Sequence, residues 1–426
     1  MTARLEESSA VRSSPPPGSF PCRLCGTPLE HKVVDLGMSP LCESFLSVDQ
    51  LDQMEPFYPL TVWVCHRCFL VQLNQYVRAD EIFTEYAYFS SYSTSFLVHC
   101  ADYVAMISDR LALGRDSFVV ELASNDGYLL QYFVERGIPC LGVEPAANVA
   151  RAAVERGVPT DVSFFGEAKG QSMAADGIAA DLVLGNNVLA QVPDLNDFVA
   201  GIAHILAPGG TVTIEFPHVL NLLTQNQYDT IYHEHFSYFS LISVEAVFAR
   251  HGMTVFDVEE IWTHGGSLRI YACHQEDNSR RVGDRVLGLR AREEAAGLRD
   301  LNTYVAFEER VRTAKRRLLA LFTDIKNRGQ TIVGYGAPGK GNTLLNYCGI
   351  RTDFLDFTVD RNPYKHGKFC PGTHIPIHPP EALDRARPDF IFILPWNLKD
   401  EIIAQLVPAR EWGAKFIVPI PDPEIL

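Results

Sequence analysis

The chain has 426 residues, a formal net charge of −15, 47% hydrophobic residues and 21% charged residues. That length exceeds what one hydrophobic core serves, so we expect two or three domains of ordinary globular composition. The acidic balance disfavours a broad surface for nucleic acid or anionic membrane. No run of 18 apolar residues is present to span a bilayer.

Residues 1–19 are predicted to form a disordered tail. They include three consecutive prolines from Pro15 and lack the apolar core of a signal peptide. The ten cysteines fit a mixture of metal-bound and free thiols, so we expect a reducing, cytoplasmic setting.

Two Cys-x-x-Cys pairs, Cys22 with Cys25 and Cys65 with Cys68, indicate a zinc site. Each pair places two thiolates on one tight turn, and two such turns can close a four-sulfur tetrahedron around the metal. Disulfides are the alternative, but ten cysteines in 426 residues are too sparse for a disulfide scaffold. We predict a structural zinc domain at residues 20–76 and expect the chemistry to lie elsewhere in the chain.

The next domain is predicted at residues 77–275. An aromatic, hydroxyl-rich stretch at residues 86–93 precedes a helical pattern, after which short apolar runs alternate with helices. Buried strands joined by helices indicate an α/β fold with a doubly wound, mostly parallel sheet. The strands predicted up to this point are residues 60–64, 70–73, 118–122, 140–143, 181–184, 211–216 and 268–273.

Residues 276–326 are rich in charge, with apolar residues spaced near 3.6, which predicts connecting helices. A second α/β domain is predicted at residues 327–426. Its strands are predicted to begin at Thr331 and to continue at residues 354–359, 390–394 and 415–418.

Two acidic residues close strands of the middle domain, where ligands of doubly wound sheets bind. Glu121 precedes a loop containing Gly127, and Glu144 stands where a carboxylate can accept hydrogen bonds from both ribose hydroxyls of an adenosine. The first loop has one glycine instead of the three of a dinucleotide fingerprint, which favours S-adenosylmethionine. Solvated strand-end acids are the alternative interpretation.

Residues 217–240 form a predicted loop over the cofactor, and they contain Tyr232, His233, Glu234 and His235 in succession. Histidine is the side chain best suited to remove a proton near neutral pH. A His-x-His metal site is one alternative, although it lacks the spacing of a catalytic zinc helix. A solvated loop is the other, and the density of aromatic and ionisable groups disfavours it.

The turn at residues 334–339 matches the dinucleotide fingerprint, and Asp360 follows the next strand, as an NAD-dependent oxidoreductase would require. Pro338 inside the turn argues against that interpretation. Lys340 and Asn342 supply a cation and an amide at a helix N-terminus, which suits a diphosphate. The turn also permits close helix–strand packing without any ligand.

Taken together, these motifs resemble the S-adenosylmethionine-dependent sugar C-methyltransferases of deoxysugar biosynthesis. The resemblance extends over nearly the whole chain after the tail. That family has a four-cysteine zinc domain, a class I methyltransferase domain and a C-terminal Rossmann-like domain, in the same order. The matching motifs are the cysteine pairs, residues 86–93, SNDG at 124–127, GVEP at 142–145, NNVLA at 186–190, YHEHF at 232–236 and GAPGKGN at 336–342.

The resemblance implies a nucleotide diphosphate 4-keto-deoxysugar as substrate, usually linked to thymidine diphosphate (dTDP). A carbon beside the ketone would be methylated; we predict C-3, with C-5 as the alternative. It also implies that His235 is the general base, that Tyr88, Tyr232 and Glu234 surround the sugar, and that the C-terminal domain binds the nucleotide. The family more often has alanine at Gly339, a change that we expect to be minor.

A ketone makes a neighbouring C–H proton removable, so a base must stand about 3 Å from that hydrogen, and a hydroxyl such as that of Tyr88 can stabilise the enolate oxygen.

The zinc ligands are predicted to be Cys22, Cys25, Cys65 and Cys68. S-adenosylmethionine is predicted to contact Glu121, Ser124, Asn125, Gly127, Glu144, Pro145, Asn186 and Asn187. The substrate is predicted to contact Lys340, Asn342, Tyr92 and His233.

Three other functions are less consistent with the sequence. An NAD-dependent oxidoreductase would leave the middle domain without a role. A zinc-knuckle module for protein or nucleic-acid interaction is opposed by the acidic balance. Methylation of RNA or of small O-nucleophiles would leave the histidine loop and the third domain without a purpose. We therefore expect a small-molecule nucleotide sugar as partner, with no nucleic acid and no membrane. The oligomeric state stays open, and a monomer is compatible with the sequence.

Overall fold

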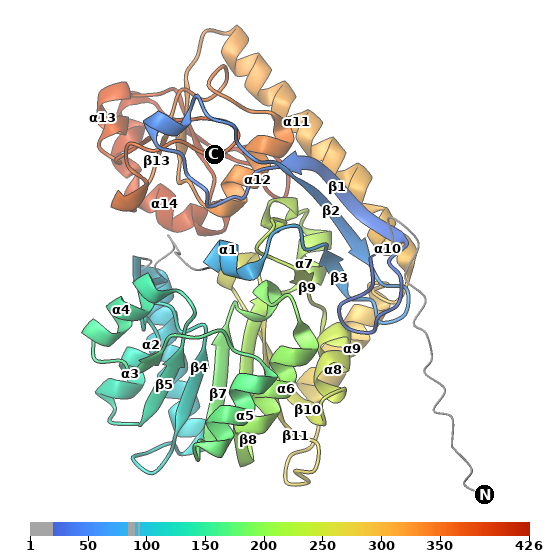
Figure 1. Cartoon of the computed structure of the whole chain (residues 1–426). Helices are drawn as coiled ribbons and strands as arrows, with labels where there is room; N and C mark the ends of the chain where they lie inside the picture. Colours follow the sequence, from blue (N-terminus) through green and yellow to red (C-terminus); the bar gives the residue numbers. More distant parts are fainter. Residues whose placement is uncertain (1–19, 84–89, 93) are drawn as a thin grey trace, which may run out of the picture.

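The computed structural model describes residues 20–83, 90–92 and 94–426. Its strands form three sheets of four, seven and six strands. Figure 1 shows the seven-stranded sheet in the lower half of the molecule and the C-terminal domain above it, with the zinc module and α11 along one side. The predicted α/β class, with two Rossmann-like sheets and an N-terminal zinc module, is confirmed.

The zinc module is built on an antiparallel sheet in the order β1-β2-β3-β9. Its strands are β1 (His31–Ser39), β2 (Tyr58–Val64), β3 (Val71–Leu73) and β9 (Ser237–Tyr238). The last strand comes from the histidine loop, where Tyr238 pairs with Val71. The predicted loop is therefore attached to the zinc module by strand pairing.

The middle sheet has the order β10-β11-β8-β7-β4-β5-β6. From β8 to β6 the strands run parallel, and β11 and β10 add an antiparallel edge. The strands are β4 (Val119–Leu122), β5 (Cys140–Val143), β6 (Thr160–Asp161), β7 (Ala180–Asn186), β8 (Leu206–Pro217), β10 (Met253–Ile261) and β11 (Ser267–His274). All four residues of β4 are buried, as a strand covered on both faces requires. Strand order reverses at β4, so the carboxyl ends of β4, β5 and β7 mark the expected ligand crevice.

Helices cover both faces of this sheet and connect it to its neighbours (Figure 1). They are α1 (Ala79–Phe83), α2 (Thr94–Leu111), α3 (Leu130–Glu135), α4 (Ala147–Glu155), α5 (Glu167–Ala175), α6 (Leu195–Ile205), α7 (Val219–Thr224) and α8 (Leu241–Ala249). The predicted connecting helices follow as α9 (Asp284–Ala295), α10 (Leu301–Val305) and α11 (Phe307–Asn327).

The C-terminal sheet has the order β14-β13-β12-β15-β16-β17, parallel except for β17. Its strands are β12 (Ile332–Tyr335), β13 (Thr358–Val359), β14 (Ile377–His378), β15 (Phe390–Ile393), β16 (Lys415–Val418) and β17 (Glu424–Ile425). Its helices are α12 (Gly339–Cys348), α13 (Ala382–Ala386) and α14 (Lys399–Gln405). The strand order of this sheet reverses at β12, whose neighbours are β13 and β15. The sheet therefore also has an expected ligand crevice at its carboxyl edge.

The zinc module does not stand apart from the rest of the chain. One hydrophobic core runs from β1 and β2 through α11 into the C-terminal sheet. The loop between β1 and β2, residues 40–57, continues onto the C-terminal domain (Figure 1). There Leu46 and Phe369 exchange backbone hydrogen bonds of 3.0 and 2.8 Å, and Glu55 accepts one of 2.7 Å from the Gly372 amide.

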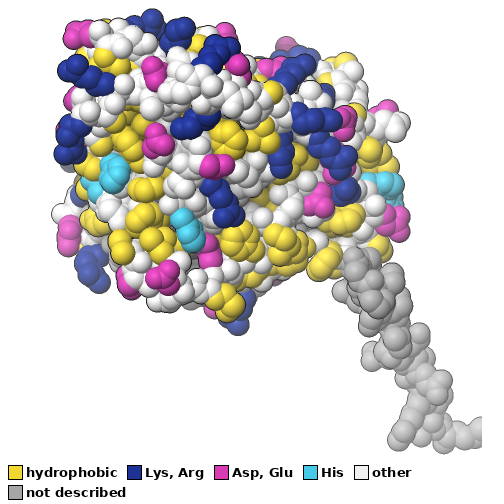
Figure 2. All heavy atoms as spheres, turned by 90° about the horizontal axis from the view of Figure 1, so that it is seen from above, with side chains coloured by type: hydrophobic (Ala, Val, Ile, Leu, Met, Phe, Trp, Pro, Cys, Tyr) yellow, Lys and Arg dark blue, Asp and Glu magenta, His cyan; other side chains and the backbone are white. Residues whose placement is uncertain are grey.

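On the face shown in Figure 2, acidic and basic side chains are interspersed and do not gather by sign. Across the described part of the chain, no helix combines the length and the apolar character needed to cross a bilayer.

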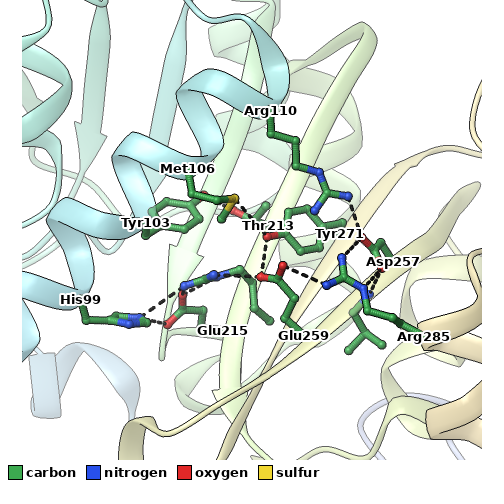
Figure 3. A network of polar contacts seen from close by, with 12 residues as sticks. His99, Tyr103, Met106, Arg110, Thr213, Glu215, Asp257, Glu259, Tyr271 and Arg285 are labelled. Atoms are coloured by element: carbon green, nitrogen blue, oxygen red, sulfur yellow. Dashed lines mark hydrogen bonds and ion pairs between the residues drawn. The ribbon is translucent and has the colours of Figure 1, made fainter.

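A buried ion network joins α2 to the antiparallel edge of the middle sheet (Figure 3). Arg269 Nε lies 2.7 Å from Glu215 Oε1, Arg269 Nη1 lies 3.0 Å from Glu259 Oε2, and His99 Nε2 lies 3.2 Å from Glu215 Oε2. Burial by itself raises the pKa of Glu215, but His99 and Arg269 outweigh it and hold that pKa below its ordinary value. Because these charges are paired, the network fixes α2 on the sheet.

A second buried carboxylate, Glu293 of α9, holds the start of α8. It accepts hydrogen bonds from the amides of Leu241 at 2.6 Å and Ile242 at 3.0 Å, and His218 Nε2 lies 2.7 Å away. Its side chain is fully buried, so these groups have no access to water as a substitute partner.

We expect Glu293→Ala to lower the free energy of unfolding by about 3–5 kcal/mol, because it leaves an imidazole and two amides unpaired in the interior. Urea denaturation followed by circular dichroism measures this change. Glu294→Ala is the matched control: its carboxylate contacts Arg299 at 3.2 Å on the surface, and its removal should change stability by about 0.5 kcal/mol or less. Equal effects of the two substitutions would contradict the assignment.

Candidate active site

A cavity of about 450 Å³ lies between the two parallel sheets. One wall is formed by residues that follow β4, β5 and β7, and the opposite wall by residues that follow β12, β13 and β15. The histidine loop contributes Tyr232 and Glu234 between them. Both sheets therefore direct the carboxyl ends of their strands at the same space, where each fold is expected to bind its ligand.

Glu144 belongs to the cavity wall formed by the middle sheet, which we call the methyltransferase wall after the resemblance noted above. Its Oε2 accepts a hydrogen bond from the Asn125 amide and its Oε1 accepts one from the Ala146 amide, each 2.9 Å long. Burial raises the pKa of this carboxyl group, and the two amides oppose the rise. Each oxygen keeps a second lone pair, so the carboxylate can also accept the two hydroxyls of a ribose.

Asn186 and Asn187 follow β7 on the same wall. Among the described residues, neither amide atom of Asn186 has a hydrogen-bond partner, and neither has Asn187 Oδ1, although all three atoms are buried. Unpaired buried polar atoms are rare and unfavourable unless a ligand completes them. Together with Glu144 they fit the amino acid and nucleoside groups of S-adenosylmethionine. Five of the predicted cofactor residues, namely Asn125, Glu144, Pro145, Asn186 and Asn187, line the cavity.

The other three predicted cofactor residues lie behind this wall. Glu121 is fully buried beside Tyr128, and burial raises its pKa well above the ordinary value, which favours the protonated form. Ser124 packs beneath the loop, with its Oγ 2.3 Å from the point that a Cβ on Gly142 would occupy. Gly127 has a φ of 74° and packs against α4. These residues shape the loop from within.

His235 packs directly behind the cavity wall. Its ring centroid lies 4.0 Å from that of Tyr232, which lines the cavity. Its Nδ1 lies 3.1 Å from the Thr230 carbonyl, an arrangement that assigns the proton to Nδ1 and leaves Nε2 as the free base. Nε2 is buried and has no partner within the described chain. Burial lowers the pKa of His235 to about 3, so the imidazole is neutral at physiological pH.

The remaining predicted substrate residues occupy different places. Tyr88 lies outside the described residues, and of Tyr92 only the backbone, in the short helix Ser90–Tyr92, is described. His233 faces the zinc module, where its Nε2 lies 3.2 Å from the Pro59 carbonyl, and it is not on the cavity wall.

On the C-terminal wall, Lys340 lines the cavity and donates a 2.8 Å hydrogen bond to Asn397. Asn342 does not line it. Its amide donates a 2.7 Å hydrogen bond to the Cys42 carbonyl and so holds the loop of the zinc module.

That loop places Glu43 on the cavity wall, so the zinc module borders the candidate site, although the sequence led us to expect the chemistry elsewhere in the chain. The expected minor effect of the change at Gly339 stays a prediction, and the structure shows that residue 339 adjoins this loop. A Cβ there would lie 2.8 Å from Cys42 Sγ and 3.1 Å from Glu43 Oε1. The Glu43 carboxylate thus occupies the start of α12, where a dinucleotide fingerprint would hold a pyrophosphate. This placement argues against the NAD-dependent alternative.

Several lining residues were not found from the sequence, namely Glu43, Phe96, Gln191, His264, Arg361 and Lys365. His264 had the clearest signal, because it precedes two glycines. It adopts a φ of 55°, and the glycines have φ of 89° and 108°. Such a turn of three left-handed residues after β10 marks a constrained site. Glu43 had no signal, since its place depends on contacts with Asn342, about 300 residues away in the sequence.

The four predicted zinc ligands come together. The sulfur atoms of Cys22, Cys25, Cys65 and Cys68 all lie within 4.8 Å of one another, with Cys22–Cys68 and Cys25–Cys65 separations of 3.5 Å. A zinc–sulfur bond of about 2.3 Å requires sulfur–sulfur separations of roughly 3.8 Å, so the cluster fits one tetrahedral ion. Gly26 and Phe69 follow the two pairs with φ of 74° and 57°, which closes the two turns in the same way.

Three family models match successive parts of the chain. They describe a zinc binding domain at residues 22–83, a methyltransferase domain at residues 98–258 and a C-methyltransferase C-terminal domain at residues 262–421. A curated relative, the C-methyltransferase NovU of Streptomyces niveus, is 36% identical over 405 residues, which cover 95% of this chain and 96% of the relative. The chain belongs to this C-methyltransferase family.

The family inferred from the motifs is thereby confirmed, and the protein is an S-adenosylmethionine-dependent C-methyltransferase with a structural zinc site. A methyltransferase of Mycobacterium leprae strain TN, named as uncharacterized, is 27% identical over 147 residues, covering 33% of this chain and 54% of that protein. The structure of magnesium protoporphyrin IX methyltransferase from Synechocystis PCC 6803 with bound S-adenosylmethionine is 15% identical, with a TM-score of 0.31, over 41% of this chain and 78% of that one.

For the C-methyltransferase, Glu144→Ala should raise the dissociation constant of S-adenosylmethionine by about 10- to 100-fold, since hydrogen bonds to a charged group contribute about 1.5–3 kcal/mol. Isothermal titration calorimetry measures this affinity. Glu135→Ala, on the exposed face of α3, is the control and should leave it unchanged. An unchanged affinity in Glu144→Ala would remove the carboxylate from the cofactor site.

Purified enzyme should carry about one zinc ion per chain, and Cys65→Ser should lose it and melt at a lower temperature, because three thiolates no longer close the site. Metal analysis by mass spectrometry and thermal denaturation provide the two measurements. Cys273→Ser, a buried cysteine of β11, should keep the zinc. Retention of zinc in Cys65→Ser would contradict the assigned ligand set.

Proposed function

We propose that this enzyme transfers a methyl group from S-adenosylmethionine to a carbon beside the ketone, C-3, of a dTDP-linked 4-keto-deoxysugar. The product would be a precursor of a branched-chain deoxysugar of the kind found in antibiotics. The observation that carries the proposal is one cavity with Glu144, Asn186 and Asn187 on one side and basic side chains on the other, with the neutral His235 packed behind Tyr232 of its wall.

The C-terminal wall carries basic side chains that a nucleotide diphosphate can contact, beside the acidic Asp360 and Glu401. Lys340 lines the cavity beside Asn397, and Arg361 lines it with about half of its side chain exposed. Within the described part of the chain, the ion pair of Arg361 is a long contact of 3.9 Å with Glu401, which leaves the guanidinium able to bind a phosphate. A diphosphate held here would direct the sugar toward the methyltransferase wall.

The proposed chemistry begins with proton removal. His235 Nε2 takes the proton from the carbon beside the ketone, and the electron pair of that C–H bond moves into the carbon–carbon bond while the ketone oxygen gains the charge. Bound S-adenosylmethionine supplies the electrophilic methyl group. The carbon forms its new bond to methyl as the sulfur–methyl bond of the sulfonium breaks, and S-adenosylhomocysteine is the leaving group. The ketone is restored, and the imidazolium of His235 releases its proton to solvent. Turning of the Tyr232 ring, which packs against His235, would open Nε2 to the cavity.

His235→Asn should reduce methyl transfer by about 10²- to 10⁴-fold, the usual contribution of a positioned base, with little change in cofactor affinity. The rate is followed with methyl-labelled S-adenosylmethionine and a 4-ketosugar substrate. In deuterium oxide without cofactor, native enzyme should exchange the substrate proton at that carbon, and the variant should not. His251→Asn, an outward-facing histidine beside Asn196, is the control. Undiminished turnover in His235→Asn would exclude His235 as the base.

A further inference from the structure

The loop of the zinc module delivers Glu43 to the cavity in a fixed position. The Asn342 amide holds the Cys42 carbonyl at 2.7 Å, and the paired backbones of Leu46 and Phe369 hold the loop three residues further on. Gly339 provides the close approach, because any side chain there would meet Cys42 and Glu43. The position of Glu43 is therefore set by the architecture of two domains.

Glu43, whose side chain is 14% exposed, and the buried Glu234 form a pair of carboxyl groups in this cavity. Cys42 Sγ lies 3.5 Å from Glu234 Oε1, so the residue adjoining Glu43 touches the second carboxyl directly. Both glutamates line the cavity, together with Lys365, whose Nζ lies 3.6 Å from Glu43 Oε2. Two carboxylates in such surroundings do not both ionise near neutral pH, and their partners decide which one keeps the proton.

The partners of the two groups are unequal. Burial and the charge of Asp360 raise the pKa of Glu43, but the Lys365 ammonium and the Gly339 amide at the start of α12 oppose this rise and favour its charged form. Among the described residues, Glu234 has the neutral thiol of Cys42 as its close partner, with the charge of Lys365 further away. The pKa of Glu234 is raised to about 8: burial is the largest cause, the charge of Glu43 adds to it, and Cys42 and Lys365 oppose the rise. The proton of the pair therefore resides on Glu234.

We propose that Glu43 is a positioning residue of the sugar site, whose charge keeps Glu234 protonated so that Glu234 presents an O–H group to the ketone oxygen. This inference rests on the proposed function. As His235 removes the carbon-bound proton, negative charge develops on that oxygen, and the Glu234 hydroxyl donates a hydrogen bond to it. When the ketone is restored, the proton is still on Glu234, so the donor is unchanged after each turnover. The zinc module thus supplies part of the active site.

The pH dependence has a defined direction. Below about pH 8 Glu234 is protonated and donates; as the pH rises through that value it ionises, loses the donor hydrogen and repels the developing enolate. Replacing Glu43 by a neutral residue removes the repulsion and leaves Lys365 to favour the charged form of Glu234. The protonated form is then lost at lower pH.

The test is infrared pH titration of the zinc-loaded full chain without substrate. The carbonyl stretch of a protonated carboxyl group is assigned to Glu234 by its absence in Glu234→Gln. In the native enzyme the band should persist at pH 7 and disappear near pH 8. In Glu43→Gln its midpoint should fall by about one pH unit or more, as expected for a coupled pair. The alkaline limb of the pH profile of kcat/KM should move by the same amount.

Glu401→Gln is the control, because it removes a carboxylate from the cavity rim without facing Glu234, and it should leave the midpoint unchanged. The absence of any Glu234 band at pH 7 in the native enzyme would overturn the proposal, whether or not Glu43→Gln folds. An unchanged midpoint in folded Glu43→Gln would also overturn it. Because the band is read without substrate, a failure to methylate 4-ketosugars is recognised separately, as a failure of the proposed function.

Discussion

The structure depends on two sheets of mostly parallel strands that face each other. The carboxyl ends of their strands enclose one cavity. Each sheet alone would offer an open crevice at the point where its strand order reverses. Contacts between the histidine loop and the C-terminal domain keep the two crevices facing each other: the Trp396 indole donates a 2.6 Å hydrogen bond to Asp229, and Tyr228 contacts Cys348 at 3.7 Å. The shared core of the zinc module, α11 and the C-terminal sheet makes this arrangement rigid.

Buried carboxylates and buried polar atoms surround this cavity. Beneath the cavity, Glu215 and Glu293 are buried with full sets of partners, and they hold α2 and α8 to the sheet. On or behind the wall, buried polar atoms such as those of Asn186 and His235 Nε2 have no partner within the described residues. A ligand in the cavity can complete those at the wall, since unpaired buried polar atoms are unfavourable.

Most strands of the two α/β sheets could be predicted from the sequence, because strands covered on both faces are continuous apolar runs, as β4 and β15 show. Strand β1 was missed, since its register is interrupted by two irregularities and three of its nine residues are exposed, so it lacks a regular pattern. Strand β9 was missed because two residues gain their conformation only by pairing with β3.

Residues of the candidate site could be predicted from the sequence where they stand at the end of a predicted strand or directly after it. Glu144 comes directly after β5, and Asn186 is the last residue of β7. Both line the cavity. Glu43 and Lys365 were beyond reach, because they belong to a loop and a short helix whose positions are set by contacts between domains. The same loop approaches Gly339 closely, so that a Cβ there would require Cys42 to shift. Long-range packing decides these positions, and no local pattern records it.

The central claim is that the cavity brings a sulfonium methyl group to an activated sugar carbon. It is tested most directly by incubating the enzyme with ¹³C-methyl S-adenosylmethionine and a panel of nucleotide-linked 4-ketosugars, and by locating the label by NMR. The account predicts a new ¹³C-methyl group bonded to the carbon beside the ketone in a dTDP-linked sugar. Label on an oxygen or a nitrogen, or transfer only to acceptors that lack a ketone, would contradict it.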